Sequence, residues 1–81
     1  MTDDQALELV RSVLHQVAPE ADLQGVGLDE PLQEALDLDS IDFLNFAEGL
    51  HEQTGLDIPE RDYPQLSTLH SCADYVVALS G

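Results

Sequence analysis

Residues 36–46, LDLDSIDFLNF, place one serine between acidic residues and in front of an apolar run. Three kinds of chemistry use oxygen atoms in such a pattern: a nucleophilic serine, a calcium-binding loop, and a hydroxyl group that accepts a covalent modification. Each makes a different demand on the residues around Ser40. The rest of the sequence can therefore distinguish between them.

A nucleophilic serine needs a general base within hydrogen-bonding distance, and a third group must orient that base. His51 follows Ser40 by eleven residues on the same expected helix, which separates the two by about 16 Å. His15 and His70 fall on polar faces of other expected helices, where a histidine is ordinarily solvated. We therefore do not expect Ser40 to be a catalytic nucleophile, and we do not expect the chain to be an enzyme.

A calcium loop is the second possibility, because Asp37, Asp39 and Glu48 match the first, third and last positions of an EF-hand loop. The match fails where Ile41 replaces an oxygen ligand and where Asp42 replaces the glycine of the sharp turn. Dedicated metal binding is therefore not expected, although an acidic surface attracts divalent cations loosely.

The third possibility is a covalently modified serine at the start of a helix. A phosphodiester on the Ser40 hydroxyl would face free backbone amides and the positive end of the helix dipole, which stabilises an anion by about 0.3 to 1 kcal/mol. No base is needed nearby, since the modifying enzyme can supply one. An unmodified N-cap serine would occupy the same place, and physical reasoning alone favours that simpler interpretation.

Helical periodicity predicts the framework that holds this stretch. A first helix begins at a capping box over residues 2–5 and ends before Pro19, and a last helix follows Ser67 or Thr68. Each has an apolar stripe of the kind that packs on a core. The stripes comprise Ala6, Leu7, Leu9, Val10, Val13, Leu14 and Val17 in the first helix and Leu69, Cys72, Ala73, Tyr75, Val76, Val77 and Leu79 in the last. We expect Cys72 to be a buried structural thiol.

A middle helix is predicted to begin at Asp39 or Ser40, one of which is the N-cap, and to end at a left-handed cap on Gly55. Its two faces differ in character: the inward side chains are Phe43, Phe46, Ala47 and Leu50, and the outward ones are Asp42, Asn45, Glu48 and Glu52. Ile41 lies among these acids. It is either a singly exposed aliphatic residue or an apolar contact for a basic partner.

The first and middle helices are joined by a long connection over residues 19–38. Four leucines are expected to anchor it on the helices, namely Leu28, Leu32, Leu36 and Leu38. Pro31 can open a short turn through Ala35, and a short helix is expected over residues 60–65. No segment alternates with period two. The sequence thus predicts an all-α fold in one domain, residues 1–81: a small antiparallel-type bundle of three main helices plus one short helix, with a long loop between the first two main helices.

The charge balance excludes several classes of partner. Seventeen acidic residues face two basic ones, which gives a formal net charge of -15 at pH 7. Such a surface repels nucleic acids and anionic membranes and attracts basic proteins. The hydrophobic fraction of 43% is too high for a disordered tail, no apolar run approaches the length of a membrane span, and the single cysteine excludes an internal disulfide. We expect a monomer in the cytoplasm that does not insert into membranes.

The stretch LDLDSID also resembles the Asp-Ser-Leu motif of acyl carrier proteins, in which the serine bears 4'-phosphopantetheine, with Ile41 in place of the usual leucine. The stretch GLDIPERDYPQLSTLHSCADYVVAL resembles the later half of the same family, so that the likeness covers residues 36–79 without gaps. The resemblance implies a standalone carrier that holds acyl thioesters on phosphopantetheine attached to Ser40. Its implied partners are a phosphopantetheinyl transferase and basic surfaces of acyl-transferring, ligating or condensing enzymes of fatty-acid, polyketide or related biosynthesis.

The resemblance also assigns roles to residues around the serine. The residues expected to dock partners are Asp39, Ile41, Asp42, Glu48 and Glu52. In this family the acyl chain can fold back between the helices, and the inward position three residues after the serine is often small. Phe43 stands there and Phe46 follows one turn later, so these residues are expected to border the acyl pocket and to fill much of it.

The chain departs from the family pattern in several places. Peptidyl carriers usually have a glycine and a histidine before the serine, so Asp39 favours the acyl branch. Asp37 stands where a glycine is common, Asn45 where a recognition glutamate is usual, and Glu48 where an apolar contact is common. The alternative within the class is an aminoacyl or D-alanyl carrier. The alternative from another class is a small acidic helical adaptor with an unmodified N-cap serine.

Overall fold

The computed structural model describes residues 1–80; Gly81, the last residue of the predicted domain, lies outside them. In the described part of the chain every regular element is helical. The three main helices are α1 (Asp3–Val17), α3 (Ser40–Thr54) and α4 (Leu69–Ser80), and the connections contain α2 (Leu32–Ala35) and two 3-10 helices, η1 (Leu23–Gly25) and η2 (Glu60–Leu66). The predicted all-α fold with three main helices is confirmed, and the connections hold more short helices than the single one expected.

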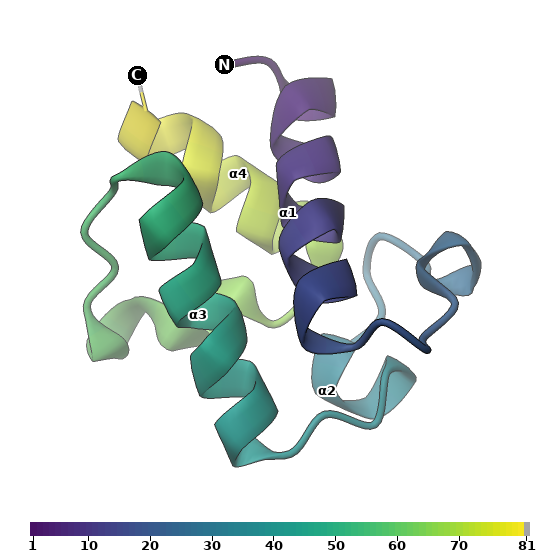
Figure 1. Cartoon of the computed structure of the whole chain (residues 1–81). Coiled ribbons are helices and arrows are strands. Elements are labelled where there is room, and N and C mark those ends of the chain that lie inside the picture. The colour runs from purple at the N-terminus through teal and green to yellow at the C-terminus, as the bar shows by residue number, and fades with distance from the viewer. Residues whose placement is uncertain (81) are drawn as a thin grey trace.

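The arrangement of the helices places the first turn of α3 at one end of the molecule (Figure 1). α1 and α3 run antiparallel beside each other, and α4 packs against α1 behind them. The N-terminus and the end of α4 lie together at the opposite end from the start of α3. The beginning of α3 lies at the same end of the molecule as α2 and the end of α1 (Figure 1).

The apolar stripes of the helices meet in one core. Its most deeply buried side chains are Phe46, Leu14, Leu32, Leu50, Leu66, Leu69, Val10, Val13, Val76 and Cys72. The prediction that Leu28 and Leu79 pack in the core is wrong, since their side chains are 45% and 41% exposed. Leu28 anchors the long connection through its backbone carbonyl, which accepts a hydrogen bond from the His70 amide at 2.9 Å. Leu79 lies in the last turn of α4.

The predicted helix ends are observed. Thr2 Oγ1 accepts a hydrogen bond from the Gln5 amide at 3.2 Å, and the Gln5 side chain accepts one from the Thr2 amide at 3.0 Å. Gly55 ends α3 in the left-handed conformation, with φ at 71°. At the start of α4, Thr68 Oγ1 accepts a hydrogen bond from the Ser71 amide at 3.0 Å, so that Thr68 is the cap. These local bonds satisfy amides that would otherwise lack partners.

The long connection is held by α2. Pro31 precedes this helix as predicted, and the Leu32 amide donates a hydrogen bond to the Ser67 carbonyl at 2.7 Å. The Leu32 and Leu38 side chains are 0% and 8% exposed. The segment that leads into α3 is therefore fixed on both its backbone and its side chains.

Within this segment, Asp37 adopts a left-handed backbone conformation, with φ at 54°. A residue with a Cβ atom is disfavoured there, although aspartate and asparagine tolerate it better than most. We expect Asp37→Gly to raise the free energy of unfolding by about 0.5 to 1 kcal/mol in urea denaturation. Asp37→Asn is the control, because it removes the same charge and keeps the Cβ atom. Equal stability of the two variants would show that relief of charge repulsion, and not of backbone strain, is responsible.

Candidate functional site

The N-cap of α3 is Asp39, whereas the sequence alone allowed either Asp39 or Ser40. Asp39 Oδ1 accepts a hydrogen bond from the Asp42 amide at 2.8 Å, and Asp42 Oδ2 lies 3.5 Å from the Asp39 amide. Ser40 is the first residue of the helix, and its side chain is exposed. The serine therefore has no role in capping, and its hydroxyl is accessible for chemistry.

The first turn of α3 also offers backbone donors. The first hydrogen bond of the α-helical pattern runs from the Phe43 amide to the Asp39 carbonyl at 3.0 Å, and the Asp42 amide is bound by the capping box. The amides of Ser40 and Ile41 precede these and have no place in that pattern. An anion attached to the serine oxygen would lie at the positive end of the helix dipole and close to these two donors.

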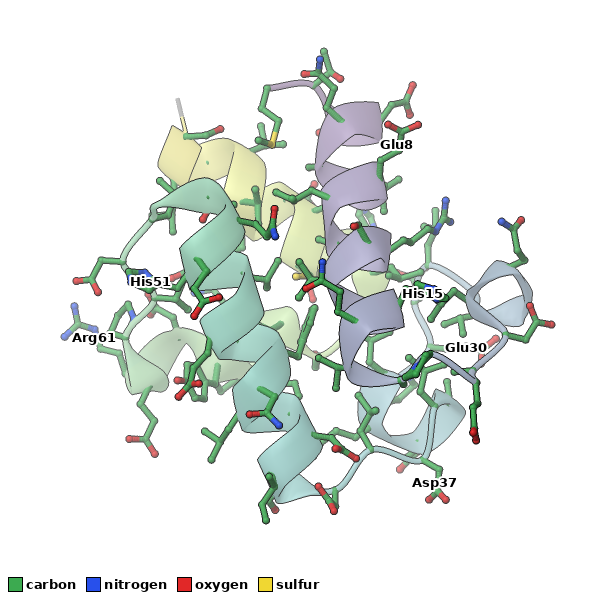
Figure 2. All side chains as sticks on the ribbon, viewed as in Figure 1. Glu8, His15, Glu30, Asp37, His51 and Arg61 are labelled. Carbon is green, nitrogen blue, oxygen red and sulfur yellow. The ribbon has the colours of Figure 1, made fainter. Side chains whose placement is uncertain are left out.

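The histidines do not form a catalytic site with Ser40. His51 Nδ1 lies 2.6 Å from the backbone oxygen of Leu56, just beyond the end of α3. His70 is placed between two exposed aspartates, at 3.2 and 3.4 Å. Figure 2 shows His51 and His15 on opposite sides of the molecule, on α3 and α1. Within residues 1–80 no group of three or more histidine, cysteine or acidic side chains is placed so that it could hold a metal ion.

The outward face of α3 combines apolar and acidic side chains. Ile41 is 69% exposed, which confirms its predicted place outside the core. Asp39, Glu48 and Glu52 are exposed as well, and Asp42 is half-buried. Sequence reasoning missed Leu44, which is 44% exposed. Its spacing of three residues from Ile41 could have revealed it, since residues so spaced are neighbours on a helix surface.

The inward face of α3 carries an aromatic cluster. Phe46 is fully buried and Phe43 is half-buried. The ring centroid of Phe43 lies 6.1 Å from that of Phe46 and 6.1 Å from that of Tyr63, and the Tyr63 ring meets it edge-on at 80°. Tyr63 belongs to η2, which is tied to α4 by a hydrogen bond of 2.7 Å from the Tyr75 hydroxyl to Asp62. Sequence reasoning missed Tyr63, because this contact joins α3 to an irregular segment far along the chain.

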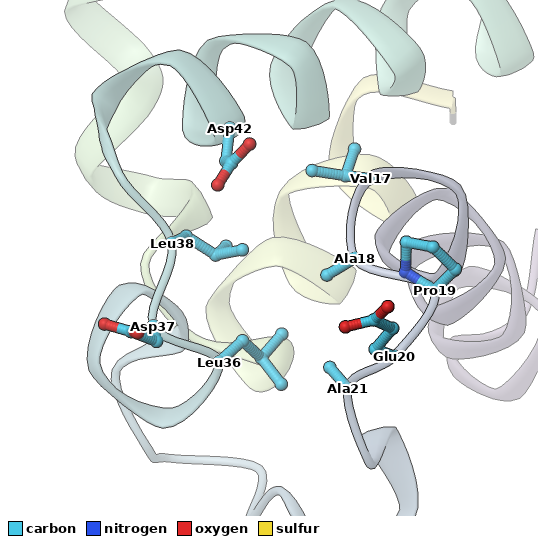
Figure 3. A pocket seen from close by; sticks show the side chains of 9 residues that line it. All are labelled: Val17, Ala18, Pro19, Glu20, Ala21, Leu36, Asp37, Leu38 and Asp42. Atoms are coloured by element: carbon cyan, nitrogen blue, oxygen red, sulfur yellow. The ribbon is translucent and has the colours of Figure 1, made fainter.

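Two cavities flank α3. The smaller one measures 160 Å³, lies next to the aromatic cluster, and is lined by Ala47, Glu48, His51, Asp57, Ile58 and Tyr63. The larger one measures 480 Å³ and lies where the end of α1, the long connection and the first turn of α3 meet (Figure 3). We call it the junction cavity, and its lining residues are Val17, Ala18, Pro19, Glu20, Ala21, Leu36, Asp37, Leu38 and Asp42. Sequence reasoning did not anticipate it.

Known proteins resemble this chain along almost its whole length. The family model for the phosphopantetheine attachment site matches residues 4–76, a span that runs from the first turn of α1 into α4. The chain belongs to this family, that of the acyl carrier proteins.

Two relatives and one solved structure agree with this assignment. The acyl carrier proteins of Tropheryma whipplei strains Twist and TW08/27 are each 26% identical over 78 residues, which cover 96% of this chain and 94% of theirs. The structure of the acyl carrier protein from Enterococcus faecalis matches with a TM-score of 0.75 at 24% identity, over 99% of this chain and 100% of that one. This last likeness shows that the fold is shared.

Acyl carrier proteins are carriers and not enzymes, and 4'-phosphopantetheine is their prosthetic group. The predicted family, class of protein and cofactor are thereby confirmed. The start of α3 suits the group, because it presents an exposed hydroxyl next to backbone donors and does not use that hydroxyl as a cap. Among the described helices, none has the length and apolar content needed to cross a bilayer.

Proposed function

We propose that Ser40 bears the phosphopantetheine group and that this chain works as a standalone carrier of acyl intermediates for fatty-acid, polyketide or related biosynthesis. The division of roles at the start of α3 supports the proposal most directly. Asp39 provides the cap and leaves Ser40 as an exposed hydroxyl at the first helical position. The same serine stands in the motif that resembles the attachment motif of the family.

Attachment needs little from the carrier beyond this hydroxyl. Ser40 Oγ forms a bond to the phosphorus next to the pantetheine of coenzyme A, the pyrophosphate bond breaks, adenosine 3',5'-bisphosphate leaves, and the serine proton passes to a base of the transferase. The amides of Ser40 and Ile41 then lie close to the phosphodiester. When bound, the group supplies the thiol that holds cargo as a thioester, while the protein supplies orientation and recognition.

Intact-mass measurement tests the proposal. Incubation of the chain with coenzyme A, magnesium and an active phosphopantetheinyl transferase is expected to add one phosphopantetheine to each molecule. An unchanged mass, under conditions that fully modify another carrier protein in the same tube, would contradict the proposal.

The partners of such a carrier are proposed to dock on the outward face of α3. Ile41 and Leu44 form an exposed apolar strip on this helix. Its acidic surroundings are Asp39, Asp42, Glu48 and Glu52. This combination suits a basic surface with an apolar centre, because complementary charge speeds encounter and the apolar contact slows dissociation. The transferase and the enzymes that load and unload the carrier would share this surface.

Ile41→Ala tests this docking surface. Because the side chain is 69% exposed, we expect the free energy of unfolding to change by less than about 0.5 kcal/mol. The KM of the transferase for the carrier is expected to rise about fivefold, as for removal of one apolar interface anchor. Leu79→Ala removes an exposed apolar side chain far from α3's first turn and is the matched control. A loss of about 2 kcal/mol or more in the Ile41 variant would place that side chain in the core.

Thiol counting gives an independent check of attachment. Cys72 is fully buried in α4 as predicted, and burial raises the pKa of its thiol to about 12. Because the thiolate is the reactive form, we expect no rapid reaction of the unmodified native protein with a disulfide reagent at pH 8. The modified protein should show one fast thiol when folded and a second only after denaturation. Rapid reaction of the unmodified native protein would show that Cys72 is accessible.

The aromatic cluster is proposed to restrict the cargo. Phe43 and Tyr63 meet edge-on between α3 and η2, and the fully buried Phe46 lies next to Phe43. Protein cores are packed close to their limit and admit further methylene groups only with strain. A long acyl chain therefore finds its route between these elements blocked, while short cargo needs no such route.

A further inference from the structure

We propose that the junction cavity receives the cargo at the end of the prosthetic arm, and that it favours a short cargo with a positive charge, such as an aminoacyl group. This inference rests on the proposed attachment to Ser40. It names the class of cargo that the family assignment leaves open.

The junction cavity lies close to Ser40 in the fold. Leu38 and Asp42 stand two residues before and two residues after Ser40, and both line it. Ser40 is not itself a lining residue, but an arm attached to it begins near the cavity and can fold back over it. The volume of 480 Å³ lies within the range of sites that hold small ligands.

The walls of the cavity are held in place by backbone hydrogen bonds. On one wall, the Ala18 amide donates to the Leu14 carbonyl at 2.7 Å and the Ala21 amide donates to the Ala18 carbonyl at 3.1 Å. On the other, the Leu38 amide donates to the Gln33 carbonyl at 2.9 Å. The apolar part of the lining consists of buried or half-buried side chains, namely Val17, Ala18, Ala21, Leu36 and Leu38. Such a floor can cover one or two methylene groups of a small cargo without rearrangement.

The charges around the apolar part of the lining determine which cargo the cavity favours. Figure 3 shows the carboxylates of Glu20 and Asp42 facing the cavity from opposite walls, while the carboxylate of Asp37 points away from it. No basic side chain belongs to the lining residues. An ammonium group would be attracted there and a cargo carboxylate repelled, over distances comparable to the screening length of about 8 Å at physiological ionic strength.

Glu20 is the better of the two acids for a test. Asp42 also closes the capping box of α3, so that its replacement would disturb the helix start. Glu20 is exposed, and no hydrogen bond within residues 1–80 engages its carboxylate. Its charge can therefore be removed without loss of a structural contact.

The aromatic cluster leaves little space for cargo on the other side of α3. The cavity next to Phe43 and Tyr63 measures only 160 Å³, so the larger space within reach of Ser40 is the junction cavity. That space is shallow and bordered by acids. A cargo that fits both conditions is short and carries a cation.

The experiment compares cargoes of one shape and different charge. The transferase loads Ser40 from coenzyme A amides in which an amine replaces the thiol, so that glycyl, propionyl and malonyl groups survive the measurement. Glycyl and propionyl differ only in an ammonium group against a methyl group. Methyl chemical shifts of Val17, Leu36 and Leu38 report occupation of the cavity. We expect glycyl to perturb them about two to five times more than propionyl at low salt, and malonyl to perturb them least.

Two variants sharpen the comparison. Glu20→Gln is expected to lower the glycyl perturbation toward the propionyl value, whereas Glu8→Gln, which makes the same charge change near the other end of α1 (Figure 2), is expected to leave it unchanged. Equal perturbation by the three cargoes, an equal response to both variants, or shifts confined to the Phe43 and Tyr63 rings would each overturn the inference. Failure of Ser40 to accept any of the amides would instead refute the proposed function.

Discussion

Ser40→Ala is expected to abolish attachment of phosphopantetheine completely, while the free energy of unfolding changes by less than about 0.5 kcal/mol. The first effect follows because the hydroxyl is the proposed nucleophile toward coenzyme A and alanine has none. The second follows because Asp39 caps α3 and Ser40 occupies the first helical position, where alanine is well tolerated. Intact mass after incubation with the transferase and urea denaturation of the unmodified proteins measure the two effects.

The combination separates a carrier from an adaptor with a structural serine. If Ser40 were needed as a cap, its replacement would cost about 0.5 to 2 kcal/mol; we expect a cost of this size from Asp39→Ala instead. Ser12→Ala, at an exposed serine in the middle of α1, controls for loss of any accessible hydroxyl and should be modified like the wild type. Modification of the Ser40→Ala protein would show that another residue accepts the group.

The features of the fold that were predictable from sequence are those that neighbouring residues determine. The capping box at Thr2 and the left-handed end at Gly55 each depend on a few adjacent positions, and both are observed. The outward orientation of Ile41 follows from the rotation of 100° per residue along a helix. Such features need no knowledge of which elements pack together.

The features that were missed depend on contacts between distant segments. Leu28 is apolar and was therefore expected to anchor the loop by packing on the core. Instead, its backbone carbonyl holds the loop and its side chain faces solvent. Tyr63 completes the aromatic cluster only because η2 packs close to Phe43. The junction cavity forms because Leu38 and Ala18 come from segments that meet in space. Hydrophobic periodicity along the chain does not predict any of these contacts between distant segments.

The two faces of α3 have different roles in the proposed carrier. The outward face presents Ile41 and acidic side chains to partners, and the inward face places Phe43 and Phe46 against the core. The first turn, between these faces, exposes Ser40. A change at Ile41 or Leu44 should therefore alter the rate of loading and leave the cargo preference unchanged, whereas a change at Phe43 should alter the preference.

Phe43→Ala is expected to let this carrier shelter a long acyl chain that the wild type leaves in solvent. Burial of an aliphatic chain contributes about 0.8 kcal/mol per methylene group, so a sheltered octanoyl chain, with six more methylene groups than acetyl, would raise the free energy of unfolding by about 5 kcal/mol relative to acetyl. In the wild type, where the Phe43 ring meets Tyr63 edge-on and the buried Phe46 lies next to it, we expect a gain below about 1 kcal/mol. The variant itself should lose about 1 to 3 kcal/mol without cargo, since a half-buried ring is removed.

Octanoyl should restore most of this loss, because the chain can occupy the space that the ring vacates, and shifts of the Phe46 ring and Leu50 methyls should report its presence there. The measurement is urea denaturation of carriers loaded with amides of two, four, six and eight carbons. Leu44→Ala, at an exposed position of the same helix, should behave like the wild type. If longer chains stabilise the wild type step by step and Phe43→Ala gives no further gain, the rings move aside for the chain. The cluster would then be a flexible wall of an ordinary acyl pocket, and cargo length would have to be limited by the partner enzymes.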